Sequence, residues 1–136
     1  MKRGGTILLV DDDPDVREYT QFVLEEASYA VSVAANAEEA LRLLSGDPEI
    51  ALLVTDVVMP GVNGVELARR ARAMRPHLAF LFVTGYTRNI APDALAGASV
   101  LDKPFAPERL LHAVKRALPA GTAHSHAAGA FTVPSP

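Results

Sequence analysis

The stretch Thr6-Ile7-Leu8-Leu9-Val10-Asp11-Asp12-Asp13-Pro14 decides the fold class of this chain. Its first five residues form a continuous apolar run of strand length, which predicts a strand buried on both faces. The run ends abruptly in three aspartates. Asp13 followed by Pro14 predicts a helix N-cap and the first residue of the helix. A buried strand followed directly by a helix is the unit that the rest of the chain repeats.

Four more strands and several more helices follow the same pattern. We expect strands over residues 30–34, 51–55, 78–83 and 99–101, and helices over residues 64–75 and from Pro107. Asn36 with Glu39 resembles a capping box and opens another helix, which ends near Gly46. Residues 87–97 leave room for only a short helix. Five strands alternating with five helical segments predict an α/β fold, a parallel sheet with helices on both faces.

Composition excludes several classes of function. The 136 residues fit one domain, which we place at residues 1–119, and residues 120–136, rich in Ala, Gly, Ser, His and Pro, are predicted to be disordered. A net charge of −3 argues against a nucleic-acid partner. No apolar run reaches the roughly 18–20 residues of a membrane span, so we expect no membrane partner. No secretory signal is recognisable, and we therefore expect a cytoplasmic protein. The absence of cysteine excludes disulfides and thiolate chemistry.

Polar residues follow four of the predicted strands. Asp11 and Asp12 follow the first, Asp56 the third, Thr84 the fourth and Lys103 the fifth. In doubly wound sheets ligands bind beyond the carboxyl ends of strands, so these side chains should converge. Crowded carboxylates need a cation, and Mg²⁺ prefers oxygen ligands. Together with a lysine and a hydroxyl, such a site suits phosphoryl chemistry, in which an aspartate can be the nucleophile.

Any one of these residues alone would more often be a cap or turn residue. The interpretation as a phosphoryl site depends on finding suitable polar residues at four strand ends together. The same residues carry a resemblance to a known family. The segments that carry it are Ile7-Leu8-Leu9-Val10-Asp11-Asp12-Asp13, Asp56-Val57-Val58-Met59-Pro60-Gly61-Val62-Asn63-Gly64, Val83-Thr84-Gly85 and Asp102-Lys103-Pro104-Phe105. Over residues 6–118 the chain resembles the receiver domains of bacterial response regulators.

The resemblance implies a flavodoxin-like five-stranded sheet in the order 2-1-3-4-5. It implies that Asp56 accepts a phosphoryl group from a sensor histidine kinase or a histidine phosphotransfer protein. Mg²⁺ would be the cofactor, bound beside Asp56. Asp12 would bind the ion directly and Asp11 through a water molecule. The backbone carbonyl of Val58 would complete the protein ligands. Thr84 and Lys103 would contact the phosphoryl oxygens. The Lys103–Pro104 peptide would be cis, which an X-Pro bond adopts at little energetic cost.

Two positions depart from the common receiver pattern. Many receivers carry an aromatic switch residue three positions before the lysine, where this chain has Val100. Tyr86, two residues after Thr84, resembles the F-A-T-G-x-Y type of stand-alone receiver and the receivers of hybrid kinases. Tyr86 therefore either takes over the switching role beside Thr84 or packs over the edge of the site. Because Val58 and Tyr86 are largely apolar and flank the acceptor, we also expect slow autodephosphorylation.

Two other classes of protein fit the sequence less well than a receiver does. An aspartyl phosphohydrolase needs an acid two residues after its nucleophile, where Val58 cannot move a proton. A nucleotide site would need a Gly-rich loop after the first strand. We expect no output domain and no enzymatic activity beyond modification of the chain's own aspartate. It would act as a monomer or weak homodimer, by binding a downstream protein or by passing the phosphoryl group on. A receiver-like binding module independent of phosphorylation remains the alternative.

One basic cluster has a simpler interpretation. Four arginines follow one another closely along the third predicted helix, at positions Arg69, Arg70, Arg72 and Arg75. They are spread around the helix beside apolar residues, and we expect them to form a solvated face.

Overall fold

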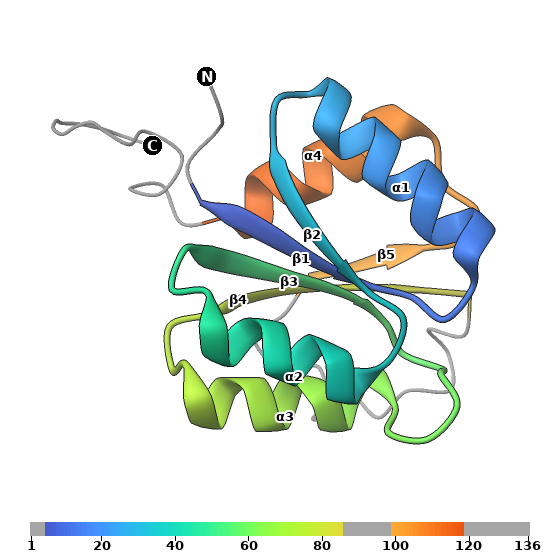
Figure 1. Cartoon of the computed structure of the whole chain (residues 1–136). Coiled ribbons are helices and arrows are strands. Elements are labelled where there is room, and N and C mark those ends of the chain that lie inside the picture. The colour runs from blue at the N-terminus through green and yellow to red at the C-terminus, as the bar shows by residue number, and fades with distance from the viewer. Residues whose placement is uncertain (1–4, 86–98, 119–136) are drawn as a thin grey trace, which may run out of the picture.

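The computed structural model describes residues 5–85 and 99–118 as nine elements along the chain (Figure 1). They are β1 Thr6–Val10, α1 Pro14–Glu26, β2 Ala30–Ala34, α2 Ala37–Gly46, β3 Ile50–Asp56, α3 Gly64–Met74, β4 Ala79–Thr84, β5 Ser99–Asp102 and α4 Pro107–Ala117. The strands form one parallel sheet in the order β2-β1-β3-β4-β5, which confirms the predicted fold class. Three features of the sequence analysis lie outside the described residues: the short helix expected within residues 87–97, Tyr86, and the segment 120–136. None of the helices described is long and apolar enough to span a membrane.

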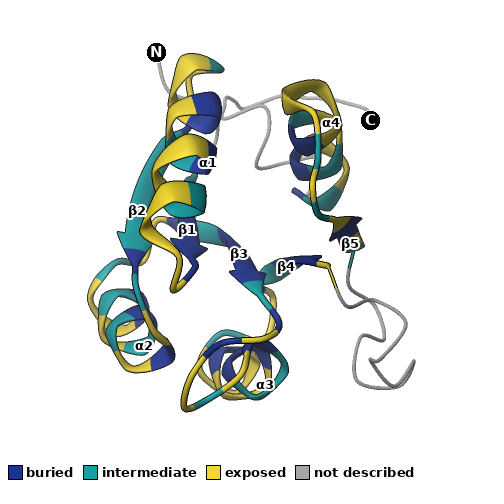
Figure 2. Cartoon of the chain, turned by 90° about the vertical axis from the view of Figure 1, so that its right-hand side faces the viewer, coloured by how far each residue is buried: buried dark blue, intermediate teal, exposed yellow. Residues whose placement is uncertain are grey.

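The sheet is the middle layer of three. Helices α1 and α4 cover one face and α2 and α3 cover the other, as Figure 2 shows from the side where the strands end. Alternate residues of β1 enter opposite cores: Leu8 and Val10 face the side of α2 and α3, whereas Ile7 and Leu9 face the side of α1 and α4. Because both faces are buried, the strands are apolar without alternation.

Helix caps hold the loops at the carboxyl edge of the sheet. The Asp13 carboxylate accepts hydrogen bonds from the Asp15 and Val16 backbone N–H groups, which confirms the predicted N-cap of α1. Asn36 caps α2 by accepting from the Glu39 N–H at 2.9 Å. The Glu39 carboxylate, however, accepts from the Ala35 N–H and not from that of Asn36, so this capping box is displaced by one residue.

Several strands extend one residue beyond their predicted ends. Asp56 pairs with Val83, and Thr84 pairs with Asp102, so the ladder continues into the polar residues. Asp56 and Thr84 are therefore the last residues of β3 and β4, and their backbones are held by the sheet. This placement matters for function, since residues on a sheet are positioned more rigidly than residues on a loop.

The prediction of a fully solvated arginine face is wrong for Arg75. The other three arginines of the cluster are exposed. Arg75 is half-buried because its guanidinium donates to the backbone carbonyls of Ile50 and Leu44, both at 2.8 Å, and to that of Asp47. It therefore ties the end of α2 to the start of β3 by satisfying carbonyls that the helix end leaves open.

Candidate functional site

Three carboxylates lie together at the carboxyl edge of the sheet. Val10 at the end of β1 pairs with Thr55 of β3, which brings Asp11 beside Asp56. Asp11, Asp12 and Asp56 each offer a carboxylate oxygen, and these oxygens lie within 4.8 Å of one another. Asp11 is buried, Asp56 is half-buried and Asp12 is exposed, so the cluster opens to solvent on the Asp12 side.

Lys103 joins two of these carboxylates. Its Nζ lies 2.8 Å from Asp56 Oδ2 and 3.1 Å from Asp11 Oδ2. The lysine follows β5, and its backbone N–H donates to the Thr84 carbonyl at 3.0 Å. The Lys103–Pro104 peptide is cis, which confirms the prediction. The ammonium group therefore lies between the ends of β1 and β3 although its own strand is at the edge of the sheet.

Burial and the charges of the site shift the pKa values of two of its groups. Burial raises the pKa of Asp11 above its ordinary value, against the opposing effects of the Asp13 N–H and of Lys103. Burial lowers the pKa of Lys103, but its hydrogen bond to Asp56 and the charges of both carboxylates outweigh this, and the net pKa is raised. Lys103 is therefore a fixed cation at neutral pH.

The remaining predicted residues lie around this cluster in different ways. Thr84 ends β4 and is fully buried. The Val58 backbone N–H donates to Asp56 Oδ1 at 3.3 Å, while Val58 as a whole residue is 54% exposed. Val100 is an exposed residue of β5 outside the carboxylate–lysine cluster. Tyr86 is not among the described residues, so both interpretations of it stay predictions.

Gly64 is a site residue whose role sequence reasoning missed. It begins α3, and its N–H donates to the Val57 carbonyl at 2.8 Å. A Cβ atom at this position would lie only 2.0 Å from the backbone oxygen of Asp56 and 2.9 Å from its carbonyl carbon. Glycine is therefore required by the close approach of two backbone segments. In the sequence, Gly64 ends the segment that follows Asp56, where the local pattern predicts only the start of a helix.

Arg17 is a second residue that the sequence did not reveal. Its Nη1 donates to the backbone carbonyl of Asp11 at 2.7 Å, from the second turn of α1. The Asp11 carboxylate in turn accepts from the Asp13 N–H at 2.9 Å. These two bonds hold the acidic loop between β1 and α1. No local pattern indicates which carbonyl a helical arginine will reach.

The donor set suits a magnesium ion. Asp11, Asp12 and Asp56 supply oxygen ligands only, which is the chemistry that Mg²⁺ prefers. Three carboxylates against the single ammonium of Lys103 leave two negative charges, which a divalent cation would balance. The residues present therefore fit the ion that the resemblance implies.

The fold and the site together define the class of protein. The family model described as "Response regulator receiver domain" matches residues 7–115, and the chain belongs to this family. Receivers are signalling modules of two-component systems.

Individual relatives include stand-alone and attached receivers. The chain is 41% identical over 121 residues to the response regulator receiver protein CpdR of Brucella abortus, covering 87% of this chain and 98% of that protein. It is 38% identical over 121 residues to the sensor kinase CckA of Brucella abortus, covering 85% of this chain but only 13% of that kinase.

Solved structures agree with the fold. The crystal structure of the receiver domain of the hybrid histidine kinase CckA matches with a TM-score of 0.73 at 34% identity, over 85% of this chain and all of that one. The response regulator TrrA of Thermotoga maritima, solved in complex with Mg²⁺ and BeF, matches with a TM-score of 0.76 at 32% identity. That match covers 87% of this chain and all of the other.

Proposed function

We propose that this chain is a response regulator receiver that accepts a phosphoryl group on Asp56 from the phosphohistidine of a sensor histidine kinase or phosphotransfer protein. Phosphorylation would change its binding to a downstream protein or precede onward transfer. The observation that carries the proposal is the contact of Lys103 Nζ with both Asp56 and Asp11 inside a cluster of three carboxylates.

The chemistry assigned to Asp56 is nucleophilic displacement. A carboxylate oxygen of Asp56 attacks phosphorus, the bond from phosphorus to the imidazole nitrogen of the donor breaks, and the donor keeps that electron pair. A carboxylate with one negative charge becomes an acyl phosphate with about two at neutral pH. Lys103, which is already beside Asp56, then pairs with the added phosphoryl charge, as charge stabilisation in phosphoryl transfer requires.

The other residues position and balance this reaction. Asp11 and Asp12, together with Asp56 and the Val58 carbonyl, would hold Mg²⁺, which supplies positive charge to the phosphoryl oxygens when it is bound. The Val58 N–H orients one oxygen of Asp56. Thr84, at the adjoining strand end, would donate its hydroxyl to a phosphoryl oxygen.

The decisive experiment measures the intact mass after incubation with Mg²⁺ and acetyl phosphate. We expect the wild type to gain the mass of one phosphoryl group and Asp56→Asn to gain none. A gain in both proteins would mean that another residue is the acceptor. No gain in the wild type, with acetyl phosphate or with candidate kinases, would favour the binding module that acts without phosphorylation.

A protein donor needs a surface next to Asp56, and the structure offers an apolar one. Tyr19 of α1 and Phe105 after β5 have ring centroids 6.3 Å apart, and they line a groove of about 470 Å³ that reaches Lys103. Phe22, one helical turn after Tyr19, is 62% exposed. Exposed aromatic groups of this kind mark protein contact sites. We assign this surface to the phosphodonor.

The choice of donor separates docking from chemistry. Phe105→Ala should slow phosphorylation by a phosphorylated histidine phosphotransfer protein and leave phosphorylation by acetyl phosphate unchanged, because the small donor needs no docking surface. Met74→Ala is the matched control, since Met74 is an exposed apolar residue at the opposite end of α3 from Gly64. Equal slowing with both donors would place Phe105 in the chemistry instead.

A further inference from the structure

Arg17 contacts the acidic loop between β1 and α1 through both its side chain and its backbone. It is the fourth residue of α1 and is half-buried. Its guanidinium Nη1 lies 2.7 Å from the backbone oxygen of Asp11, a short distance typical of hydrogen bonds in which the donor carries a charge. Its backbone N–H donates to the carbonyl of Asp13 at 2.9 Å. The start of α1 is thereby tied to Asp11 at the other end of the loop.

Each polar group of Asp11 has a hydrogen-bond partner. Its N–H donates to the carbonyl of Ala34, the last residue of β2, at 3.3 Å. Its carboxylate accepts from the Asp13 N–H and from Lys103, and its carbonyl accepts from Arg17. Asp11 is buried, and a buried carbonyl that loses its partner is costly. Loss of the Arg17 bond would therefore shift the Asp11 backbone or draw water into the loop.

The Asp12 carboxylate is restrained much less than that of Asp11. Within residues 5–85 and 99–118, no hydrogen bond or ion pair involves the exposed Asp12 side chain, so its direction depends on the backbone that carries it. The Asp11 carbonyl and the Asp12 Cα belong to one planar peptide unit. A donor that holds this carbonyl also fixes the plane from which the Asp12 side chain leaves. Arg17 therefore restrains Asp12 through the peptide bond that precedes it.

A guanidinium group beside a cation site has two opposing effects on binding. The charge of Arg17 repels a divalent cation held by Asp11, Asp12 and Asp56, which alone would weaken binding. A restrained Asp12, however, needs less ordering when the ion binds, which strengthens binding. Because Arg17 donates to a carbonyl and not to a carboxylate, it does not compete with the ion for a carboxylate oxygen. The geometry therefore favours the second effect.

We propose that Arg17 is a positioning residue of the cation site, which directs the Asp12 carboxylate toward those of Asp11 and Asp56 through its bond to the Asp11 carbonyl. The inference rests on the proposed function in naming Mg²⁺ as the ion. Removing a partner that orients a metal ligand typically weakens metal binding by about 10–100-fold. Because Arg17 acts on Asp12 through a peptide bond, we expect the lower end of this range.

The first experiment measures the affinity of the unphosphorylated full-length chain for Mg²⁺ by calorimetry with magnesium chloride. Arg17→Met removes the charge and the donor but keeps an unbranched apolar stem, and its Kd should be about tenfold higher than that of the wild type. Arg17→Lys keeps the charge and a donor without the planar fork of arginine, and its Kd should be intermediate. Urea unfolding in EDTA verifies that each variant is folded under the conditions of the titration.

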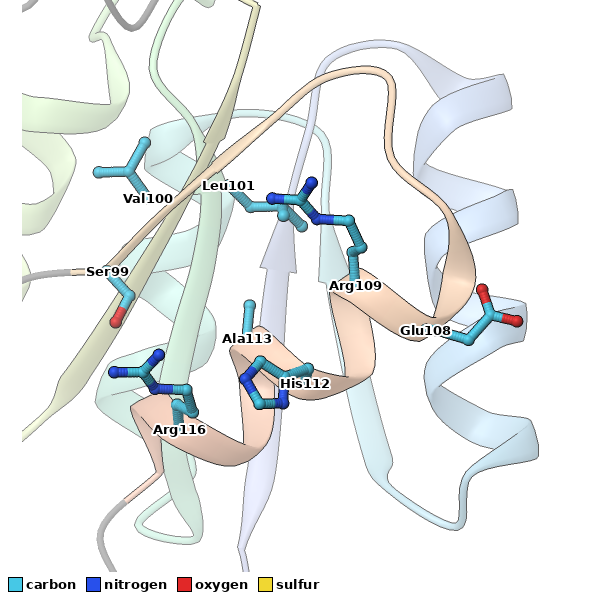
Figure 3. Close-up of a pocket in the computed structure, with 8 residues that line it drawn as sticks. All are labelled: Ser99, Val100, Leu101, Glu108, Arg109, His112, Ala113 and Arg116. Atoms are coloured by element: carbon cyan, nitrogen blue, oxygen red, sulfur yellow. The ribbon is translucent and has the colours of Figure 1, made fainter.

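Arg116→Met is the matched control. Arg116 lies in the last turn of α4, where it lines, together with Ser99, a groove of about 620 Å³ between β5 and α4 (Figure 3). Ser99 begins β5, so this arginine lies toward the opposite end of the strand from Lys103. The variant removes an exposed arginine from a helix without changing the acidic loop. Its affinity for Mg²⁺ should equal that of the wild type.

A second measurement needs no metal. The Asp13 N–H donates to the Asp11 carboxylate at 2.9 Å, so hydrogen exchange at this amide reports on the order of the loop. In EDTA, we expect NMR to show faster exchange of the Asp13 amide in Arg17→Met than in the wild type. The Glu39 amide, which donates to Asn36 at the start of α2, should exchange at the wild-type rate. A general loss of stability would instead accelerate exchange at both amides.

Phosphorylation by acetyl phosphate separates metal binding from chemistry. Arg17→Met should react slowly at limiting Mg²⁺ and approach the wild-type rate at saturating Mg²⁺, because Asp56 and Lys103 are unchanged. A wild type that binds Mg²⁺ but is not phosphorylated would contradict the proposed function, while the affinity and the exchange rates would still decide the role of Arg17.

Three results would overturn the proposal. Tighter Mg²⁺ binding by Arg17→Met would show that Arg17 acts only as a repelling charge. Equal weakening by Arg116→Met would show that the effect does not come from the acidic loop. An affinity or an Asp13 exchange rate that is unchanged in Arg17→Met would show that the bond to the Asp11 carbonyl does not restrain Asp12.

Discussion

Replacing Gly64 with alanine should disturb the backbone of Asp56, the proposed phosphoryl acceptor. The added Cβ atom would lie 2.0 Å from the backbone oxygen of Asp56, 2.9 Å from its carbonyl carbon and 3.0 Å from Val57 Cα. All three are backbone atoms, so no side chain can rotate away to relieve the contact. A carbon and an oxygen in ordinary contact are about 3.3 Å apart. The end of β3 or the start of α3 must therefore move by roughly 1 Å or more.

This displacement has two expected costs. Overpacking in a close-packed interior typically destabilises a protein by about 1–3 kcal/mol, and the hydrogen bond from the Gly64 N–H to the Val57 carbonyl is strained as well. A misplacement of about 1 Å at a reacting group can slow a reaction about a hundredfold. We therefore expect both lower stability and much slower phosphorylation of Asp56 in Gly64→Ala.

Urea unfolding followed by circular dichroism and phosphorylation by acetyl phosphate measure the two effects. Gly46→Ala is the matched control, because Gly46 ends α2 and a Cβ there meets nothing within 4 Å. Alanine at that helical position should leave stability unchanged or raise it by up to about 1 kcal/mol. If Gly64→Ala unfolds at the wild-type urea concentration and is phosphorylated at the wild-type rate, the two backbones do not approach as described and the reasoning is refuted.

Three further predictions concern the charges and the access of water at the site. Lys103→Met should lower the free energy of unfolding by about 1–3 kcal/mol in EDTA, because Asp11 and Asp56 lose their shared partner. Mg²⁺ should recover part of this loss. Equal losses in urea titrations with and without Mg²⁺ would contradict the prediction. Burial raises the pKa of Asp11 above 3.8, so the native state binds more protons at this group than the unfolded state does between 3.8 and the raised value. In EDTA its contribution to stability should therefore fall as the pH rises through this window, and Mg²⁺ affinity measured by calorimetry should rise through it. Asp11→Asn should abolish the first trend and weaken the second, because Asp12 and Asp56 still titrate as ligands. Val58→Asn should shorten the lifetime of the phosphorylated protein several-fold, because a polar side chain beside Asp56 can hold the attacking water. A half-life of seconds for the phosphorylated wild type would show that Val58 does not keep water from the acyl phosphate.

Much of the fold follows from local patterns in the sequence. The run from Thr6 to Val10 is apolar throughout because both faces of β1 are covered, and that property can be read without knowing what covers them. Asp13 and Asn36 cap helices through hydrogen bonds to residues two or three positions later, so their roles depend on the adjacent sequence alone. The proximity of Asp11 and Asp56 was also predictable, because parallel strands end at the same edge of a sheet.

Only the tertiary structure decided the roles of Gly64, Arg17 and Arg75. The sequence shows a glycine at a helix start, but the need for it arises from the backbone oxygen of Asp56, which packing brings into contact. Arg75 lies in a run of arginines of which three are exposed, and it differs because the carbonyls of Leu44 and Ile50, distant in sequence, lie within its reach. Apolar runs and helix caps depend on neighbouring residues, so the sequence alone determines them. The close approach of segments distant in sequence arises only when the helices pack on the sheet.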